Sequence, residues 1–154
     1  MPVPLKLGEI ELDVPFFQAS LSGYSDRAMR RLAREFGAPF ALTGVILAKS
    51  AAHPGVLRKP TYSPALDPHP VGAQLLGEEP HVMVRAAQCV VAAGYDLVDL
   101  NFACPVPKVL RRDRGGAILR DPDRALAIYR AVRDAVRVPV TVKLRIGFDH
   151  SEVH

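Results

Sequence analysis

The chain has 154 residues, of which 49% are hydrophobic, and this is enough to build the core of one domain. No apolar run approaches the roughly 18 residues that a membrane-spanning helix requires, and the first residues lack the pattern of a signal peptide. Its two cysteines, with no CxxC pair and no histidine cluster, argue against a disulfide framework and a zinc site. We therefore expect a protein of the reducing cytoplasm with no metal and no membrane partner. The formal net charge of +4 suits a nucleic-acid partner, although many metabolic enzymes share it.

The first half of the chain begins with two apolar segments separated by a helical pattern. Residues 14–20 and 40–45 are predicted as buried strands. Between them, Asp26 precedes a helix that stops at Gly37. The side chains expected to face the core from this helix are Met29, Leu32, Ala33 and Phe36. Residues 52–70 are rich in proline and are predicted as an excursion over the surface.

The second half repeats the order of strand and helix more clearly. Strands are predicted at residues 71–76, 96–102 and 138–144, with helices that begin near Pro80 and Pro122. The first helix is expected to stop at Gly94. The residues expected to face the core are Met83, Ala86, Ala87 and Val90 in the first helix, and Ala125, Ile128, Tyr129, Val132 and Val136 in the second.

Apolar strands that alternate with helices of about a dozen residues predict an α/β protein with a parallel sheet covered by helices. Two architectures satisfy this pattern, the doubly wound open sheet and the (β/α)8 barrel. An open sheet of five strands would be complete at this length, whereas a barrel needs about 250 residues. The pattern by itself leaves both open.

Polar residues fall where the predicted strands end. In a barrel, the chemistry gathers at these positions. The positions are occupied by Ser20, Ser22, Gln74, Asn101, Cys104 and Lys143. An unpaired ammonium in an apolar layer is costly, so Lys143 is expected to meet an anion or a polar ligand, unless it extends to solvent at the strand end.

The two cysteines lie in different surroundings. Cys89 lies in a predicted helix and is expected to act as a small core residue. Cys104 lies in a loop directly before Pro105, and its position is compatible with either a nucleophile or an acid. The loop continues with a basic stretch that predicts either a phosphate-facing patch or a solvated loop and contains Lys108, Arg111, Arg112 and Arg114.

Together, these segments resemble the tRNA-dihydrouridine synthases. Residues 101–109 match that family's Asn-x-x-Cys-Pro-x-x-Lys-Val motif, and the motif is followed by Gly115-Gly116-Ala117. Supporting matches lie, in the family's order, at residues 22–26, 72–77 and 140–147. They cover nearly the whole chain.

The resemblance implies a flavin-binding (β/α)8 TIM barrel, truncated here to about its first five β/α units. Residues 1–154 would be the N-terminal portion of this catalytic domain, without the rest of the barrel and without a C-terminal tRNA-binding domain. It also implies an FMN cofactor, reduced by NADPH, that passes hydride to C6 of a uracil base in tRNA. Cys104 would then protonate C5 as the general acid.

The resemblance assigns roles to the remaining site residues. Ser20, Leu21 and Ser22 would lie against the flavin, Gln74 and Lys143 would hydrogen-bond its polar edge, and Asn101 would help to position flavin or base. A cation beside the flavin stabilises negative charge on the reduced ring. The residues expected to approach tRNA are Lys108 and Arg145.

Two positions depart from the family's pattern. The chain has Ala19-Ser20-Leu21 where the family commonly has Ala-Pro-Met, and Thr43 is followed by Gly44 where the family commonly has an acidic residue. Neither change removes the expected chemistry. We expect this chain alone to bind FMN poorly, because barrels usually hold phosphate at the loops after strands seven and eight.

Two other functions are compatible with the sequence. A dihydroorotate- or dihydropyrimidine-dehydrogenase type of flavoenzyme would share the barrel, the flavin and a similar cysteine motif, but would act on a free pyrimidine. A non-catalytic RNA-binding fragment would use the basic face alone. The basic loop and the Gly115-Gly116-Ala117 continuation favour the tRNA enzyme.

Overall fold

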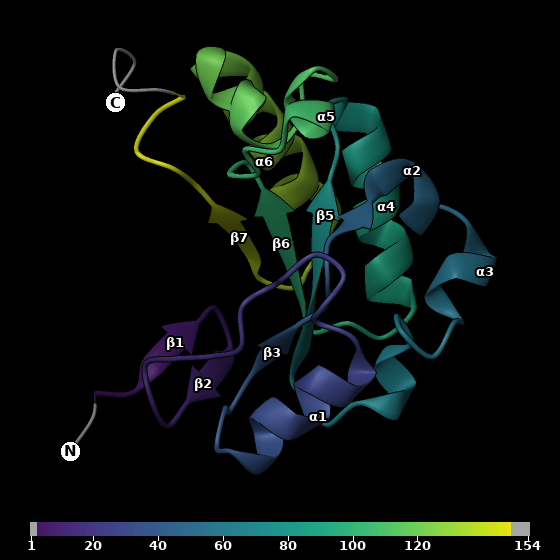
Figure 1. Cartoon of the computed structure of the whole chain (residues 1–154), viewed down its shortest axis with the longest axis vertical. Coiled ribbons are helices and arrows are strands. Elements are labelled where there is room, and N and C mark those ends of the chain that lie inside the picture. Colours follow the sequence, from purple (N-terminus) through teal and green to yellow (C-terminus); the bar gives the residue numbers. More distant parts are fainter. Residues whose placement is uncertain (1–2, 149–154) are drawn as a thin grey trace.

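The computed structural model describes residues 3–148 and contains a parallel sheet (Figure 1). Its strands follow the order β3 (Ala41–Leu42), β5 (Val71–Leu76), β6 (Leu97–Asn101) and β7 (Val140–Lys143), and β4 (Ile46–Leu47) also pairs with β5. All these pairings are parallel, and neighbouring strands follow one another along the chain. The predicted α/β class is confirmed, and the arrangement is that of a barrel wall.

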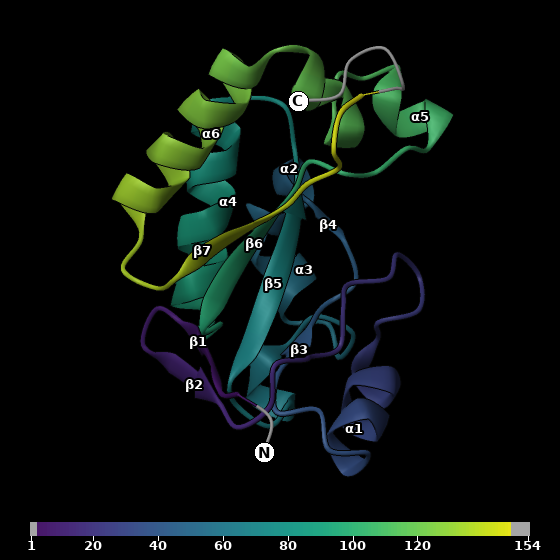
Figure 2. The same ribbon diagram turned by 90° about the vertical axis from the view of Figure 1, so that its left-hand side faces the viewer.

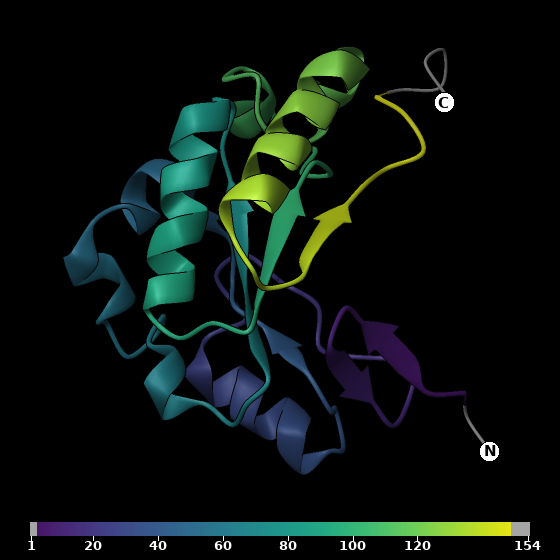
Figure 3. The same ribbon diagram turned by 180° about the vertical axis from the view of Figure 1, so that it is seen from behind.

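Two long helices cover the outer face of this sheet. Figures 2 and 3 show α4 (Pro80–Ala92) and α6 (Pro122–Ala135) together on the same side of β5, β6 and β7. The predicted core faces are confirmed in both helices, where the fully buried positions are Met83, Ala86, Ala87, Val90, Ile128 and Val132. These side chains pack against the outward residues of β5 and β6 in one apolar cluster.

A hairpin that the sequence analysis did not predict covers the amino ends of the strands. It consists of β1 (Leu5–Leu7) and β2 (Ile10–Leu12), which are antiparallel. Its apolar side chains pack on a small second cluster formed by Leu12, Phe40, Leu42 and Leu97. The turn residue Gly8 has a φ of 61°, and a Cβ there would lie 2.6 Å from Cγ of Pro139, just before β7.

The helix α1 (Arg27–Glu35) begins at the predicted cap, where Asp26 accepts a hydrogen bond from the Met29 amide at 2.9 Å. Its predicted apolar stripe is wrong, because Leu32 is 53% exposed and Phe36 is 83% exposed. The residue that α1 buries is Arg30.

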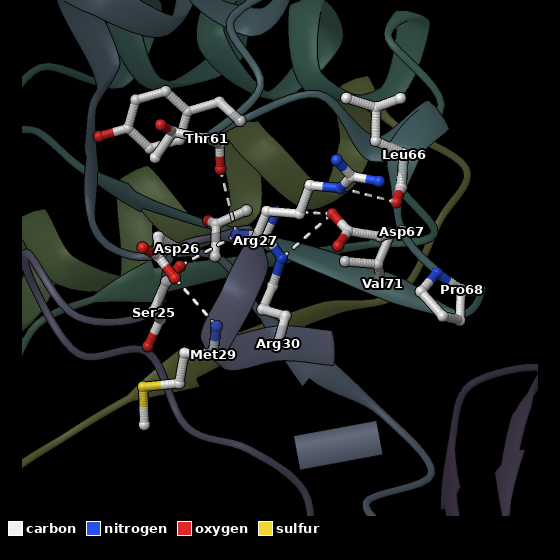
Figure 4. A network of polar contacts seen from close by, with 12 residues as sticks. Ser25, Asp26, Arg27, Met29, Arg30, Thr61, Leu66, Asp67, Pro68 and Val71 are labelled. Carbon is white, nitrogen blue, oxygen red and sulfur yellow. Dashed lines mark hydrogen bonds and ion pairs between the residues drawn. The ribbon is translucent and has the colours of Figure 1, made fainter. Parts of the chain in front are cut away.

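Arg30 can be buried because each of its three guanidinium nitrogens finds an acceptor (Figure 4). It binds the Asp67 carboxylate, with Nη2–Oδ2 at 2.5 Å, and donates to the carbonyls of Ser25 and Thr61 at 3.0 and 3.1 Å. We call Arg30 and Asp67 the ionic clamp. A pattern of apolar spacing does not detect such a pair, since it counts arginine as a surface residue.

The first two predicted strands are shorter than expected. Residues 14–20 contribute only one bridge, between Gln18 and Ala41. The segment 40–45 contains only the short strand β3, because two of its residues make other hydrogen bonds. The Thr43 hydroxyl accepts from the main-chain N–H of Gln74 at 3.2 Å, and the Gly44 N–H donates to the Ser25 carbonyl. The chain resumes pairing at β4.

The remaining elements are single turns. The excursion predicted at residues 52–70 contains two short turns, α3 (Pro54–Leu57) and η1 (Pro64–Leu66), and is preceded by α2 (Ala48–Ala51). The loop after β6 contains α5 (Pro107–Leu110) and η2 (Gly115–Arg120). The turns α5 and η2 follow the carboxyl end of β6, where the candidate site lies.

Candidate active site at the carboxyl ends of the strands

Three of the predicted site residues lie on adjacent strands. Gln74 lies within β5, and Asn101 and Lys143 are the last residues of β6 and β7. In the parallel register, Gln74 pairs with Asp99 and Asn101 pairs with Lys143. Gln74 and Asn101 are buried, whereas Lys143 is exposed at the end of its strand.

A chain of short hydrogen bonds connects these strands. Asp99 accepts from Thr141 Oγ1 at its Oδ1 and from Gln74 Nε2 at its Oδ2, both at 2.6 Å. Gln74 Oε1 in turn accepts from Asn101 Nδ2 at 2.7 Å. We call Thr141, Asp99, Gln74 and Asn101 the polar ladder. Because each side chain is hydrogen-bonded to the next, the ladder fixes the relative positions of β5, β6 and β7 on this face.

Asp99 is the ionisable member of the ladder, and burial makes its charged form less favourable. Burial raises the pKa of Asp99, and the hydrogen bonds from Thr141 and Gln74 with the charge of Lys143 reverse part of this effect. Within residues 3–148, Asp99 forms no ion pair at contact distance. The groups in direct contact with the carboxyl are therefore neutral donors, and Lys143 acts on it from beyond contact distance.

The main chain of Cys104 is held from two sides. Asn101 Oδ1 accepts the amide hydrogens of Ala103 and Cys104, at 3.1 and 3.0 Å. On the other side, the Gly116 amide donates to the Cys104 carbonyl at 3.0 Å. Gly115 has a φ of 58°, and a Cβ at this position would lie 2.8 Å from Cβ of Cys104. The glycine pair thus allows the loop to return directly over the half-buried cysteine.

The loop of Ser20, Leu21 and Ser22 lies between the bridge at Gln18 and helix α1. Leu21 and Ser22 are exposed, but Ser20 is buried, and its hydroxyl has no hydrogen-bond partner within the described part of the chain. The Ser25 hydroxyl closes this loop, since it accepts from the Leu21 amide at 2.8 Å and donates to the Ala19 carbonyl at 3.1 Å. A buried hydroxyl without a partner is uncommon in proteins and is a position where a ligand atom can bind.

Basic residues form part of the walls of two adjoining cavities beside this loop, together with apolar residues such as Leu47 and Leu76. The first has a volume of about 210 Å³ and includes Ser22, Lys108 and Arg112 in its wall. The second, of about 390 Å³, shares Arg112 and Arg114 with the first and adds Lys49. Arg145 lies nearby, with its Nη1 atom 3.3 Å from the position that a Cβ on Gly116 would occupy. The predicted basic stretch therefore does face a hollow surface.

Arg114, however, does not belong to a free phosphate-facing patch. Its guanidinium forms a two-pronged ion pair with Glu78, with Nη2–Oε1 at 2.6 Å. The hydrogen bond from Arg114 holds the pKa of Glu78 below its ordinary value of 4.5. This pair joins the loop after β6 to the end of β5.

Sequence reasoning identified Gln74, Asn101, Cys104 and Lys143 but missed two members of the ladder, Asp99 and Thr141. A signal for them was present in the sequence. Asp99 lies two residues before Asn101, and Thr141 lies two residues before Lys143. Since alternate residues of a strand share one face, these polar pairs mark the inward face of two strands that otherwise look wholly apolar.

This fold and site define the class of the protein. The family model for dihydrouridine synthase (Dus) matches residues 17–154, which is nearly the whole chain. The chain belongs to the dihydrouridine synthase family, as its motifs predicted.

Individual relatives agree with this membership. The chain is 39% identical over 155 residues to the probable tRNA-dihydrouridine synthase 1 of Synechocystis sp., a match that covers 98% of the chain and 42% of that protein. It is 32% identical to the probable tRNA-dihydrouridine synthase of Treponema pallidum, covering 97% of the chain and 46% of that protein. The probable tRNA-dihydrouridine synthase of Rickettsia prowazekii is 36% identical, and the match covers 94% of the chain and 45% of that protein. The chain spans less than half the length of these curated relatives.

A solved structure supports the architecture. Histamine dehydrogenase from Rhizobium sp. 4-9 superposes with a TM-score of 0.65 over 92% of this chain and 31% of that protein, at 16% identity. At this identity the likeness concerns the fold alone, and it agrees with the first β/α units of a (β/α)8 barrel. None of the helices within residues 3–148 is long and apolar enough to cross a membrane. In the same range, no three His, Cys, Asp or Glu side chains are grouped to hold a metal ion.

Proposed function

We propose that this chain is the N-terminal portion of the catalytic barrel of an FMN-dependent tRNA-dihydrouridine synthase. The reaction is the NADPH-linked reduction of the C5=C6 bond of uridines in tRNA, with Cys104 as the general acid. The observation that carries this proposal is the loop of Cys104, held by Asn101 and Gly116 at the carboxyl end of the strands. The relatives named as probable tRNA-dihydrouridine synthases support the choice of substrate.

The residues present fit a flavin at this face. The unpartnered hydroxyl of Ser20, together with Leu21 and Ser22, would hold one side of the ring system. The exposed ammonium of Lys143 would bind its polar edge. When bound and reduced by NADPH, FMN supplies the hydride that C6 of the base requires.

Gln74 and Asn101 would complete the polar edge of the flavin site. Gln74 retains one amide hydrogen and one lone pair beyond its two ladder bonds. It has no exposed surface in this structure, so a direct bond from Gln74 to the flavin requires neighbouring side chains to move. Its first role is to hold Asn101, which lies closer to the reacting cysteine.

Cys104 would supply the proton. As hydride reaches C6, the Sγ–H bond of Cys104 breaks and its proton passes to C5 of the uracil, which restores a neutral, saturated base and leaves a thiolate. The side chain is half-buried, so that a base stacked in the site would shield it from water. The loop contacts fix the cysteine main chain while this transfer occurs.

The basic residues around the two cavities would bind the tRNA backbone. Lys108 and Arg112 line the smaller cavity, and Arg145 lies beside Gly116. Because phosphate contacts add binding energy without reading the sequence, these residues would position the tRNA and would not select the uridine.

The test uses a chimaera in which this chain replaces the matching part of the Synechocystis relative, beside the 154-residue chain alone. Each protein is titrated with FMN, then incubated with NADPH and unmodified tRNA, and dihydrouridine is measured by mass spectrometry. Cys104→Ala should bind flavin normally but form almost no dihydrouridine, while Cys89→Ala, in helix α4, should keep its activity. Normal product formation by Cys104→Ala would remove the acid assignment. A folded chimaera that neither binds FMN nor forms product would overturn the proposed function.

A further inference from the structure

We propose that Asp99 is a positioning residue that sets the orientation of two site amides and, through them, the main chain of Cys104. Asp99 is 5% exposed and lies beneath the candidate site. The inference adds a residue to the proposed function and rests on it for its catalytic meaning. The structural effect is measurable without flavin or tRNA.

One end of the ladder accepts hydrogen bonds only. An ionised carboxylate has no hydrogen to donate, so the Gln74 side chain must turn Nε2, and not Oε1, toward Asp99 Oδ2. The Thr141 hydroxyl holds the other carboxylate oxygen at 2.6 Å and thereby fixes the plane of the carboxylate. The orientation of the Gln74 side-chain amide thus follows from the acceptor oxygen that Asp99 presents to it.

The other end of the ladder donates only. The main-chain N–H groups of Ala103 and Cys104 have no lone pair, so Asn101 must turn Oδ1 toward them. Its Nδ2 then faces Gln74 Oε1 at 2.7 Å. Both ends therefore require the same direction of donation, which runs from the cysteine loop through Asn101 and Gln74 to Asp99.

A reversal of either amide is unfavourable in this arrangement. If the Gln74 amide turned over, its oxygen would face the Asp99 carboxylate and its nitrogen would face Asn101 Nδ2. Removing the carboxylate removes the acceptor that holds Gln74 Nε2 at this end of the ladder. Gln74 then gains freedom to rotate, so the hydrogen bond that it accepts from Asn101 is held less firmly, and the acceptor of the Cys104 amide becomes more mobile.

The test measures how fast iodoacetamide alkylates Cys104 in the 154-residue chain, at constant pH, in a Cys89→Ala background. Asp99→Leu fills a similar volume but accepts no hydrogen bond. Alkylation should accelerate about fivefold, as expected when the loop loses one buried hydrogen bond. Asp99→Asn keeps an oxygen that accepts from Gln74 Nε2, and its rate should stay within about twofold of the parent.

A matched control separates positioning from general loss of stability. Asp67→Asn weakens an equally buried carboxylate in the ionic clamp, far along the chain from the ladder, and should leave the alkylation rate unchanged. Asp99→Ala is the second variant if circular dichroism shows that Asp99→Leu is unfolded, and the same acceleration is expected. The proposal is wrong if the folded Asp99 variant reacts at the parent rate, or if Asp67→Asn accelerates the reaction equally. Either result stands whether or not the chain binds FMN.

Discussion

Two buried carboxylates, Asp67 and Asp99, are stabilised in opposite ways. Asp67 lies against a full positive charge, with Arg30 Nη2 at 2.5 Å, and this pair joins α1 to the end of the proline-rich excursion. Asp99 lies against an amide and a hydroxyl, and burial raises its pKa. The ionic clamp pairs two opposite charges in direct contact, whereas the Asp99 carboxyl meets only neutral donors at hydrogen-bonding distance.

The two kinds of contact point to different roles: the ion pair of Asp67 stabilises the fold, whereas Asp99 lies at the candidate site. A buried pair of opposite charges in direct contact holds two elements together, and breaking it by removing one partner is strongly destabilising. A buried carboxylate held by neutral donors is costly, and such perturbed groups are concentrated at functional sites. In this chain the costly carboxylate is the one at the carboxyl ends of the strands, next to the cysteine loop.

The largest expected effect is the loss of the clamp. Arg30→Met keeps most of the side-chain volume but leaves Asp67 buried without its cation, and should lower the free energy of unfolding by about 3–5 kcal/mol. Urea denaturation followed by circular dichroism measures this loss. Arg31→Met, at an exposed position of the same helix, should change stability by less than about 0.5 kcal/mol. Equal losses in the two variants would contradict the clamp.

The next effect concerns the cysteine loop. Gly115→Ala places a Cβ 2.8 Å from Cys104 Cβ and also strains a residue with a φ of 58°. We expect a loss of about 2–3 kcal/mol in thermal unfolding and a displaced Cys104. Gly23→Ala has a similar φ of 79° but open space around the new methyl group, so its loss should be about 1 kcal/mol. Equal losses would show that the close approach to Cys104 is unimportant.

The pair of Glu78 and Arg114 is ionic like the clamp, but it is only partly buried. We therefore expect its contribution to stability to be smaller than that of the clamp. Since folding lowers the Glu78 pKa below 4.5, its contribution is present above that pH and is lost as the pH falls through the folded value. Glu78→Gln should therefore cost about 1–2 kcal/mol at neutral pH and progressively less in acid. Glu79→Gln, at a half-exposed neighbouring carboxylate, should show almost no cost at either pH. A cost for Glu78→Gln that does not change with pH would contradict the ion pair.

The smallest effect is at the outer end of the ladder. Thr141→Val is nearly isosteric and removes one donor to Asp99, which should cost about 1 kcal/mol at neutral pH. The hydroxyl stabilises the charged carboxylate, so the cost should decrease when acid protonates Asp99. Unfolding experiments at neutral and acidic pH measure both values, with Thr61→Val, at an exposed residue, as the control. A cost that is the same at both pH values would contradict the role of the hydroxyl in stabilising a charged Asp99.

Most of the sheet could be predicted from the sequence because its strands are buried on both faces. The segment 71–76 is apolar except for Gln74 and forms β5 with the predicted bounds. Helices α4 and α6 follow from the spacing of their apolar residues and from a proline at the first turn of each.

The errors occurred where polar contacts overrode apolar spacing. In α1, the tertiary partner Asp67 draws Arg30 into the interior, and the exposed side chains Leu32 and Phe36 had the better helical pattern. The motif identified Cys104 and Asn101, but the hydrogen bond between Asp99 and Gln74 depends on the register of β5 against β6, which no local pattern contains.

The hairpin of β1 and β2 affects where the chain can be shortened. The family match starts at residue 17, after the hairpin has ended. A version trimmed to that boundary would retain the cysteine motif but would uncover Phe40, Leu42 and Leu97 at the amino ends of the strands. Since exposed apolar patches of this kind cause self-association, the trimmed protein should precipitate during expression, and the sixteen residues before the match should accompany the barrel in any shortened version.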